Sequence, residues 1–272
     1  MTRKQRILLR IQRIPAGKLW VFVVKQAWAA LFGGLLLIGI IVTNYIDLPW
    51  LARYDWLFVW AILIQIVMLA AKLEKPREVV TIILFHLVGL GMELFKTSHS
   101  IGSWTYPEDN IIRLYTVPLF SGFMYAAVGS YIARAWRVLE LRYTDYPRTV
   151  WTILLSAAIY GNFFSHHFLP DIRWLLFACL GVMYWKTRVY FRLSKAEHSM
   201  PLLVGFGLVA FFIWIAENIG TYTRAWLYAG QGGAWQMVSL QKLGSWLLLM
   251  VISFVMIKCM HDWQTQTNHT AE

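Results

Sequence analysis

A glutamate inside an apolar segment, Glu93, is followed by an aromatic turn that contains Trp104 and Tyr106. An ionisable side chain at membrane depth is costly and usually faces the bundle interior or a water-filled cavity, where it marks a functional site. At a rise of 1.5 Å per residue, Glu93 lies about 22 Å along its helix from Glu78. This position is in the outer leaflet.

A second glutamate, Glu217, has similar surroundings, because Trp226 and Tyr228 follow it. By the same helical rise, Glu217 lies about 24 Å from Pro201, so we expect both glutamates to face each other at similar depth. Two carboxylates in one poorly hydrated site cannot both ionise cheaply, and one of them would keep a proton. Such a pair suits general acid catalysis on an apolar substrate or proton coupling in a transporter, and the sequence leaves both open.

Polar neighbours extend this predicted site and also offer a structural alternative. Lys96 could simply neutralise Glu93, and Arg224 could neutralise Glu217. The predicted catalytic residues are Glu93 and Glu217, with Lys96 and His99. The predicted substrate-binding residues belong to the aromatic turns and the outer helix ends: Trp104, Tyr106, Glu108, Asn162, His166, Asn218, Arg224, Trp226 and Tyr228.

The histidines suggest an alternative metal site. His86 shares a helix face with Glu93, two turns away, and His166, His167 and Asp171 lie together in one loop. No compact HExxH pair is present, and the ligands would have to converge from separate spans. We therefore expect no cofactor, and keep a divalent metal on these five residues as the alternative.

The composition indicates a membrane protein. Of the 272 residues, 58% are hydrophobic and only 14% are charged, which is more apolar surface than a soluble core of this size can bury. The expected fold class is an all-α integral membrane protein. We expect one transmembrane domain, residues 21–260, after a basic amphipathic segment, 1–20, and before a cytoplasmic tail, 261–272.

The apolar runs predict about eight transmembrane helices. Their approximate bounds are Phe22–Thr43, Trp56–Ala71, Val79–Phe95, Leu114–Ala135, Val150–Phe164, Trp174–Trp185, Leu202–Ile219 and Leu240–Met256. The second, fifth and sixth runs are short for an upright crossing of about 20 residues.

The positive charge of the chain follows membrane topology. The net charge is +11, but Lys and Arg occur in short segments between apolar runs, so we expect no nucleic-acid partner. With eight spans, all but six of the 25 Lys and Arg residues lie on one side, which the positive-inside rule makes the cytoplasm. Both termini are then cytoplasmic, and three unusual loops, 98–110, 165–171 and 221–236, lie outside.

The two halves of the chain resemble each other weakly. The glutamate and aromatic pair of residues 93–106 recur in residues 217–228, and Leu48-Pro49 recurs as Leu169-Pro170, at an offset of about 120 residues. Four spans per unit would give both units the same orientation. The pattern therefore predicts two parallel four-helix repeats about an axis along the membrane normal.

With segments 93–108 and 217–228 in view, the chain resembles the YoaT-like family of uncharacterised bacterial multi-span membrane proteins over most of its length. This resemblance implies a bacterial cytoplasmic (inner) membrane and brings no established active site. The Trp104–Pro107 turn after a membrane glutamate is also similar to patterns in membrane-bound carotenoid cyclases and hydratases, whose chemistry protonates a polyene. The Pro-x-Glu-Glu signature of the cyclases is absent.

The function expected from these residues is a lipid- or isoprenoid-modifying enzyme that uses Glu93 and Glu217 as acid and base on the outer-leaflet side. Its partners would be membrane lipids and an apolar or amphipathic small molecule. Two alternatives remain open, a proton-coupled transporter or permease with the same glutamate pair and a non-catalytic membrane scaffold. The residues do not define an oligomeric state.

Overall fold

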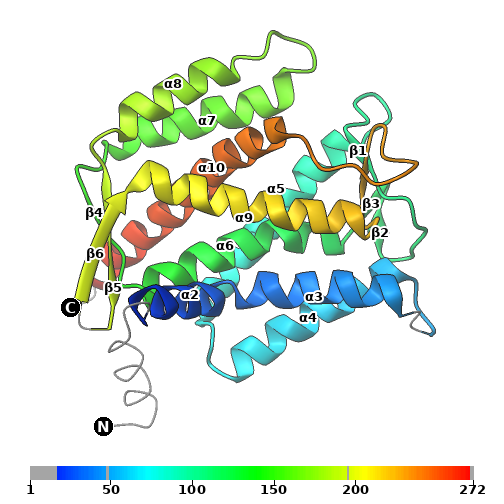
Figure 1. The fold of residues 1–272 in the computed structure, drawn as a ribbon, viewed down its shortest axis with the longest axis horizontal. Coiled ribbons are helices and arrows are strands. Elements are labelled where there is room, and N and C mark those ends of the chain that lie inside the picture. Colours follow the sequence, from blue (N-terminus) through cyan, green and yellow to red (C-terminus); the bar gives the residue numbers. More distant parts are fainter. Residues whose placement is uncertain (1–16, 47–48, 195, 270–272) are drawn as a thin grey trace.

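The computed structural model describes residues 17–46, 49–194 and 196–269, and these form a bundle of long helices with short strands at both ends (Figure 1). The predicted basic N-terminal segment falls outside this part of the chain, except for the residues that begin the first helix. The helices are α2 Gly17–Ala29, α3 Leu31–Tyr45, α4 Arg53–Ala70, α5 Pro76–Lys96, α6 Phe120–Val138, α7 Thr149–Ser165, α8 Arg173–Tyr184, α9 Leu202–Tyr222 and α10 Leu240–His269.

The chain is an α-helical integral membrane protein. Among the described residues, α4, α5, α9 and α10 contain stretches that are long and apolar enough to cross a membrane, and α2 with α3 adds a fifth crossing if the bent pair is one span. Helices α7 and α8 are apolar but have only 17 and 12 residues. A helix occupies each predicted range, but the count of eight crossings remains a prediction. The last helix also continues past the predicted tail boundary, to His269.

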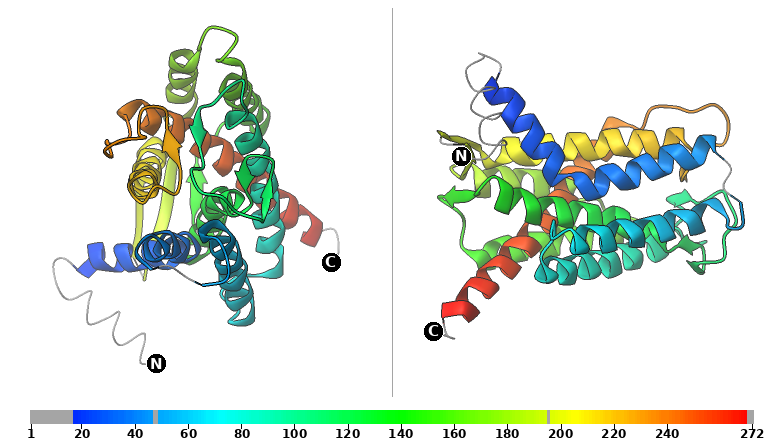
Figure 2. Two further views of the ribbon diagram at one scale, coloured as in Figure 1. Left: turned by 90° about the vertical axis from the view of Figure 1, so that its right-hand side faces the viewer. Right: turned by 90° about the horizontal axis from the view of Figure 1, so that it is seen from below.

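The first predicted span is bent in the structure. The axes of α2 and α3 differ by 71° (Figure 2, right), so the span predicted over Phe22–Thr43 is divided between two helices. Arg134 of α6 is 1% exposed and donates a hydrogen bond of 2.7 Å to the backbone oxygen of Trp28, close to the bend. A buried guanidinium thus stabilises the backbone where the helix direction changes.

The fourth predicted span begins later than expected. Residues Arg113–Leu114 and Val117–Pro118 form a hairpin, β2–β3, and α6 begins only at Phe120. Tyr115 has a φ of +53°, a left-handed conformation that interrupts a helix, and Pro118 lacks the amide hydrogen that a helix interior needs. Apolar composition alone did not reveal this turn.

A three-stranded antiparallel sheet lies at the end of the bundle where the described chain begins and ends (Figure 1). It consists of β4 Arg142–Thr144, β5 Arg188–Leu193 and β6 Ala196–Pro201, in the order β4-β5-β6. At the opposite end, β1 Trp104–Thr105 pairs with β7 Leu227–Tyr228. The two ends of the bundle are therefore built differently, and the second of them carries the glutamate site.

The helices of the two halves make equivalent contacts when α3, α4, α5 and α6 are matched with α7, α8, α9 and α10. Helix α3 contacts α4 and α6, and α7 contacts α8 and α10. Pairs α5–α6 and α9–α10 also pack together, and the second helices of these pairs, α6 and α10, contact each other across the centre. This arrangement agrees with two four-helix repeats.

Candidate functional site

Glu93 is 2% exposed on α5, and neutral groups hold its carboxylate. The indole nitrogen of Trp104 and the hydroxyl of Tyr106 donate to Oε2 at 2.8 and 2.9 Å. The hydroxyl of Tyr125, on α6, donates to Oε1 at 3.0 Å. An indole N–H can only donate, so Oε2 must act as an acceptor in this geometry.

Glu217 is 5% exposed on α9 and has equivalent partners. The indole nitrogen of Trp226 and the hydroxyl of Tyr228 donate to Oε1 at 2.9 and 2.5 Å. The side chain of Trp246, on α10, also lies beside this carboxylate. Each glutamate therefore contacts one Trp and one Tyr from the loop that follows its helix and one aromatic side chain from the next long helix.

A two-stranded ribbon connects the two glutamate sites. Strands β1 and β7 are antiparallel, with Trp104 opposite Tyr228 and Thr105 opposite Leu227. An antiparallel strand pair has a local two-fold axis. In this register the axis relates Trp104 to Trp226 and Tyr106 to Tyr228, as the sequence repeat requires. The rings of Trp104, which donates to Glu93, and Tyr228, which donates to Glu217, meet with centroids 6.1 Å apart, so the two carboxylates lie below the same ribbon. Figure 2 (left) views the bundle from this end.

The backbone that leads into the ribbon is also repeated. The hydroxyl of Thr97 donates to the backbone oxygen of Glu93, and the hydroxyl of Thr221 donates to that of Glu217. In each half, a residue just before the strand then donates to the last turn of the helix. These bonds are Ser103 N to Lys96 O and Ala225 N to Gly220 O.

Two glycines allow the aromatic donors to approach. A Cβ on Gly220 would lie 1.9 Å from the indole of Trp226, and a Cβ on Gly89 would lie 2.6 Å from the ring of Tyr125. Real Cβ atoms do not approach other atoms this closely, so both positions need a residue without a side chain. From the sequence alone, these glycines indicate only general helix packing.

The phenols of the two loop tyrosines, Tyr106 and Tyr228, remain protonated at neutral pH. Burial, then the negative charge of Glu93, raises the pKa of Tyr106 well above its ordinary range. Burial, then the charge of Glu217, does the same to the pKa of Tyr228. Both hydroxyls can therefore serve as hydrogen-bond donors to the glutamates.

A small apolar pocket adjoins the pair. Its volume is 30 Å³, about the volume that one water molecule takes up in the liquid. Tyr125 and Trp246, whose rings are 6.4 Å apart, contribute to its wall, and so does Met92, the neighbour of Glu93. The remaining wall comes from apolar residues of α5, α6, α7, α9 and α10.

The two cations considered as neutralising partners, Lys96 and Arg224, form no ion pair with the glutamates in the described chain. Lys96 lies three residues after Glu93, but its ammonium is 2.7 Å from Nε2 of His167 and forms no ion pair within the described chain. Arg224 is exposed at the turn that ends α9, with a φ of +57°. Spacing along a helix does not determine where a long side chain ends, and neutral donors already surround both carboxylates.

The five residues of the metal alternative do not converge. In the part of the chain that the structure describes, no group of three or more His, Cys, Asp or Glu side chains could hold a metal ion. His86 packs against Phe123 with ring centroids 4.3 Å apart, while Glu93 faces its aromatic donors. His166 contacts the backbone oxygen of Asn162 at 2.9 Å.

The loop that contains the paired histidines is held by Asn162 and Asp171. Asn162 donates to Asp171 at 3.0 Å and accepts from the backbone of Ile172. Although burial alone would raise the pKa of Asp171, hydrogen bonds from Asn162 and Arg173 and the charge of Arg173 lower it. Asn162 was predicted to bind substrate, but here it connects α7 to α8.

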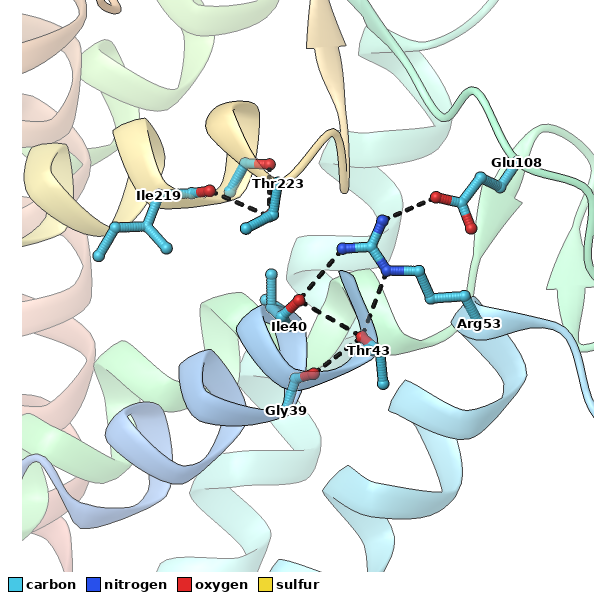
Figure 3. Close-up of polar contacts among 8 residues, drawn as sticks. Gly39, Ile40, Thr43, Arg53, Glu108, Ile219 and Thr223 are labelled. Atoms are coloured by element: carbon cyan, nitrogen blue, oxygen red, sulfur yellow. Dashed lines mark hydrogen bonds and ion pairs between the residues drawn. The ribbon is translucent and has the colours of Figure 1, made fainter. Parts of the chain in front are cut away.

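Glu108 forms an ion pair instead of facing the glutamates. Arg53 donates to Glu108 at 2.7 Å and also to the hydroxyl of Thr43 and the backbone oxygen of Ile40 (Figure 3). Arg53, Glu108 and Thr43 line a polar pocket of 360 Å³ between the end of α3 and the start of α4. This pair links the loop after β1 to the first half of the bundle.

Two further predicted residues lie outside the carboxylate pair. Asn218 donates to the backbone oxygen of Trp214 and accepts from the backbone of Val238, so it supports the loop before α10. His99 is exposed. Neither side chain contacts a glutamate among the described residues.

Several contributing residues were missing from the predicted site. Tyr125 and Trp246 were not included, although their separation is close to the repeat offset of about 120 residues, a signal that could have identified them. Lys242 places its ammonium 4.0 Å from the centre of the Tyr228 ring. Its position near the start of an apolar helix was the available signal.

The fold and the site define a helical integral membrane protein with two related, deeply buried glutamates beneath an aromatic ribbon. The chain belongs to the family described as "Protein of unknown function (DUF817)", whose model matches residues 18–254. It is 43% identical over 248 residues to the uncharacterized protein YoaT of Bacillus subtilis (strain 168), covering 91% of this chain and 93% of that protein. The YoaT-like resemblance is thereby confirmed, whereas these matches give no support to the carotenoid cyclase similarity.

The chain is also similar to solved structures of MvINS, a mycobacterial Insig homologue from Mycobacterium vanbaalenii. The identity is 13%, and the TM-score is 0.47, with 68% of this chain and 93% of that chain covered. A cross-linked MvINS trimer gives a TM-score of 0.48 at 13% identity, with 69% and 95% covered.

Proposed function

We propose that this protein is a membrane-embedded enzyme that modifies a lipid or isoprenoid by proton transfer, with Glu93 and Glu217 as acid and base. The observation that carries this proposal is the pairing of two buried carboxylates that only neutral hydrogen-bond donors hold. A carboxylate held by a cation would be tied up in an ion pair, whereas these can exchange a proton.

The proposed chemistry needs only proton movement. The carboxyl group of one glutamate gives a proton to a carbon–carbon double bond of the substrate, and the cation that forms loses a proton from an adjacent carbon to the other carboxylate. The double bond has then moved, and no oxidant or reductant is consumed. Nearby Tyr and Trp side chains can stabilise a carbocation through their ring faces.

The environment of the pair favours an apolar substrate. The Trp104 and Trp226 indoles belong to a buried apolar cluster at the outer end of the bundle, and the pocket beside Tyr125 is lined almost entirely by apolar residues. The 30 Å³ pocket must widen before a lipid chain can enter. This proposal therefore includes an opening motion between the helices that line it.

Comparative lipidomics of a deletion strain tests this proposal. The strain is complemented with the wild-type gene, Glu93→Gln, Glu217→Gln or the control Glu108→Gln, whose glutamate is paired with Arg53. We expect one lipid to accumulate in the deletion strain and with the first two variants, but not with the control. Unchanged lipids with all variants at wild-type membrane levels would contradict enzymatic activity and favour proton-coupled transport, the alternative use of the same pair.

We further propose that the protein lies in a bacterial cytoplasmic membrane with the β4-β5-β6 end in the cytoplasm. That sheet carries Arg142, Arg188 and Arg192, as the positive-inside rule favours. A single cysteine placed at Asp109 should react with an impermeant maleimide in intact spheroplasts, and one at Lys186 only after lysis. The reverse labelling pattern would contradict this orientation.

A further inference from the structure

Lys96 is a buried cation without an anionic partner. Its side chain is 3% exposed, and its ammonium contacts Nε2 of His167 at 2.7 Å and the ring of Phe163 at 4.2 Å from the centroid. No carboxylate lies within ion-pair distance of it in the described chain. Buried charges in proteins are ordinarily paired, so a negatively charged group beside this ammonium would stabilise it.

A second cation lies at the same end of the bundle. Lys242, near the start of α10, holds its ammonium 4.0 Å from the ring centre of Tyr228 and 5.7 Å from that of Trp104. It therefore lies against the ribbon that covers the two glutamates. Lys242 also has no carboxylate within ion-pair distance among the described residues, and its charge repels that of Lys96.

Two neighbouring carboxylates attract the lysines without forming ion pairs with them: Glu217 attracts Lys242, and Asp171 attracts Lys96. Arg173 pairs with Asp171 at 2.6 Å, so Asp171 is already engaged. Burial, then the charge of Lys96, lowers the pKa of His167. A neutral His167 accepts a hydrogen bond from Lys96 and leaves its charge in place.

The loop beside Lys96 carries large exposed apolar side chains. Phe168 is 72% exposed, Leu169 62% and Trp174 78%. Such residues at the end of membrane helices are typical of the level where lipid headgroups meet the hydrocarbon. We therefore expect Lys96, which contacts His167 of this loop, to lie at headgroup depth.

We propose that Lys96 and Lys242 bind the anionic headgroup of an amphipathic molecule whose apolar chain extends toward Glu93 and Glu217. A phosphate supplies the required charge and accepts hydrogen bonds from both ammonium groups. The inference that this molecule is the substrate rests on the proposed function. Headgroup binding itself can be measured without any reaction.

Native mass spectrometry of the purified protein in detergent tests this binding. Phosphatidic acid is compared with phosphatidylcholine of identical chains, using the wild type, Lys242→Gln, Lys96→Gln and the exposed control Arg113→Gln. We expect the wild type and the control to bind phosphatidic acid at least tenfold more tightly than phosphatidylcholine, and both lysine variants to lose that preference. Lys242→Arg should retain it. If Lys96→Gln fails to fold, the partly exposed Lys242 still gives the test.

Equal binding of the two lipids by the wild type, or unchanged preference in Lys242→Gln, would overturn the proposal. Competition by inorganic phosphate at the concentration where phosphatidic acid binds would assign the same two lysines to a free anion. Glu93→Gln separates the two ideas. If Glu93→Gln binds phosphatidic acid normally and the cellular lipids are unchanged, headgroup binding by the lysines is supported. The same result contradicts the proposed enzymatic function of the glutamates.

Discussion

Trp104 and Tyr228 lie opposite each other in the β1–β7 ribbon, yet they donate to different glutamates. Trp104 binds Glu93 at 2.8 Å, and Tyr228 binds Glu217 at 2.5 Å. Their rings meet edge to face with centroids 6.1 Å apart. A displacement of either strand would therefore disturb both carboxylates.

Removing an indole N–H should destabilise the protein. Trp104→Phe or Trp226→Phe leaves a buried carboxylate with one donor fewer, at a cost of about 1–3 kcal/mol. The two variants should have similar effects because their surroundings are related by the repeat. Thermal unfolding in detergent measures this, with the 78% exposed Trp174→Phe as a control. A control as destabilised as the two site variants would contradict the assigned role.

Gly220→Ala should displace Trp226. The added methyl group would lie 1.9 Å from the indole, and such overpacking costs about 1–3 kcal/mol. At Gly207, in the same helix, an added methyl group would meet no atom within 4 Å. Gly207→Ala should therefore be neutral or slightly stabilising. Unfolding temperatures of the two variants that fall by equal amounts would argue against a close approach of Trp226.

The contribution of His167 to stability should fall as the pH drops below about 6.5, its ordinary pKa. Because the folded state lowers this pKa, the unfolded chain binds the proton more readily, and acid favours unfolding. His167→Gln should flatten the dependence of the unfolding temperature on pH between about 5 and 7.5. His166, whose pKa burial also lowers, supplies a remaining slope of the same sign. An unchanged slope in His167→Gln would exclude His167 as the origin.

At the other end of the bundle, Arg134→Gln should be destabilising. Arg134 and Glu74 are both buried and interact electrostatically, and Glu74 also accepts hydrogen bonds from Gln65 and Ser130. Removing the guanidinium takes a buried hydrogen bond from the backbone oxygen of Trp28 and a favourable charge from Glu74, at a cost of about 1–3 kcal/mol. The measurement is unfolding in detergent, with the more exposed Arg137→Gln as the control. The double variant Arg134→Gln with Glu74→Gln should recover part of the loss; additive losses would show that the charges are independent.

The positions of the helices were predictable because a long apolar run in a membrane protein forms a helix buried in lipid or protein. The association of Glu93 with Trp104 and Tyr106 was predictable because the same pattern recurs around Glu217. Hydropathy could not locate the bend after α2, which involves a distant arginine, Arg134. It also could not reveal the direction of Lys96, because that depends on where the loop after α7 places His167.

The β1–β7 ribbon has a consequence for the ancestry of the chain. Each half contributes one strand of the ribbon, so a half-length protein would present a single strand with an unpaired edge. Two identical copies could pair these strands around a true symmetry axis and place their glutamates side by side. The present chain has the arrangement that a fusion of two such copies would produce.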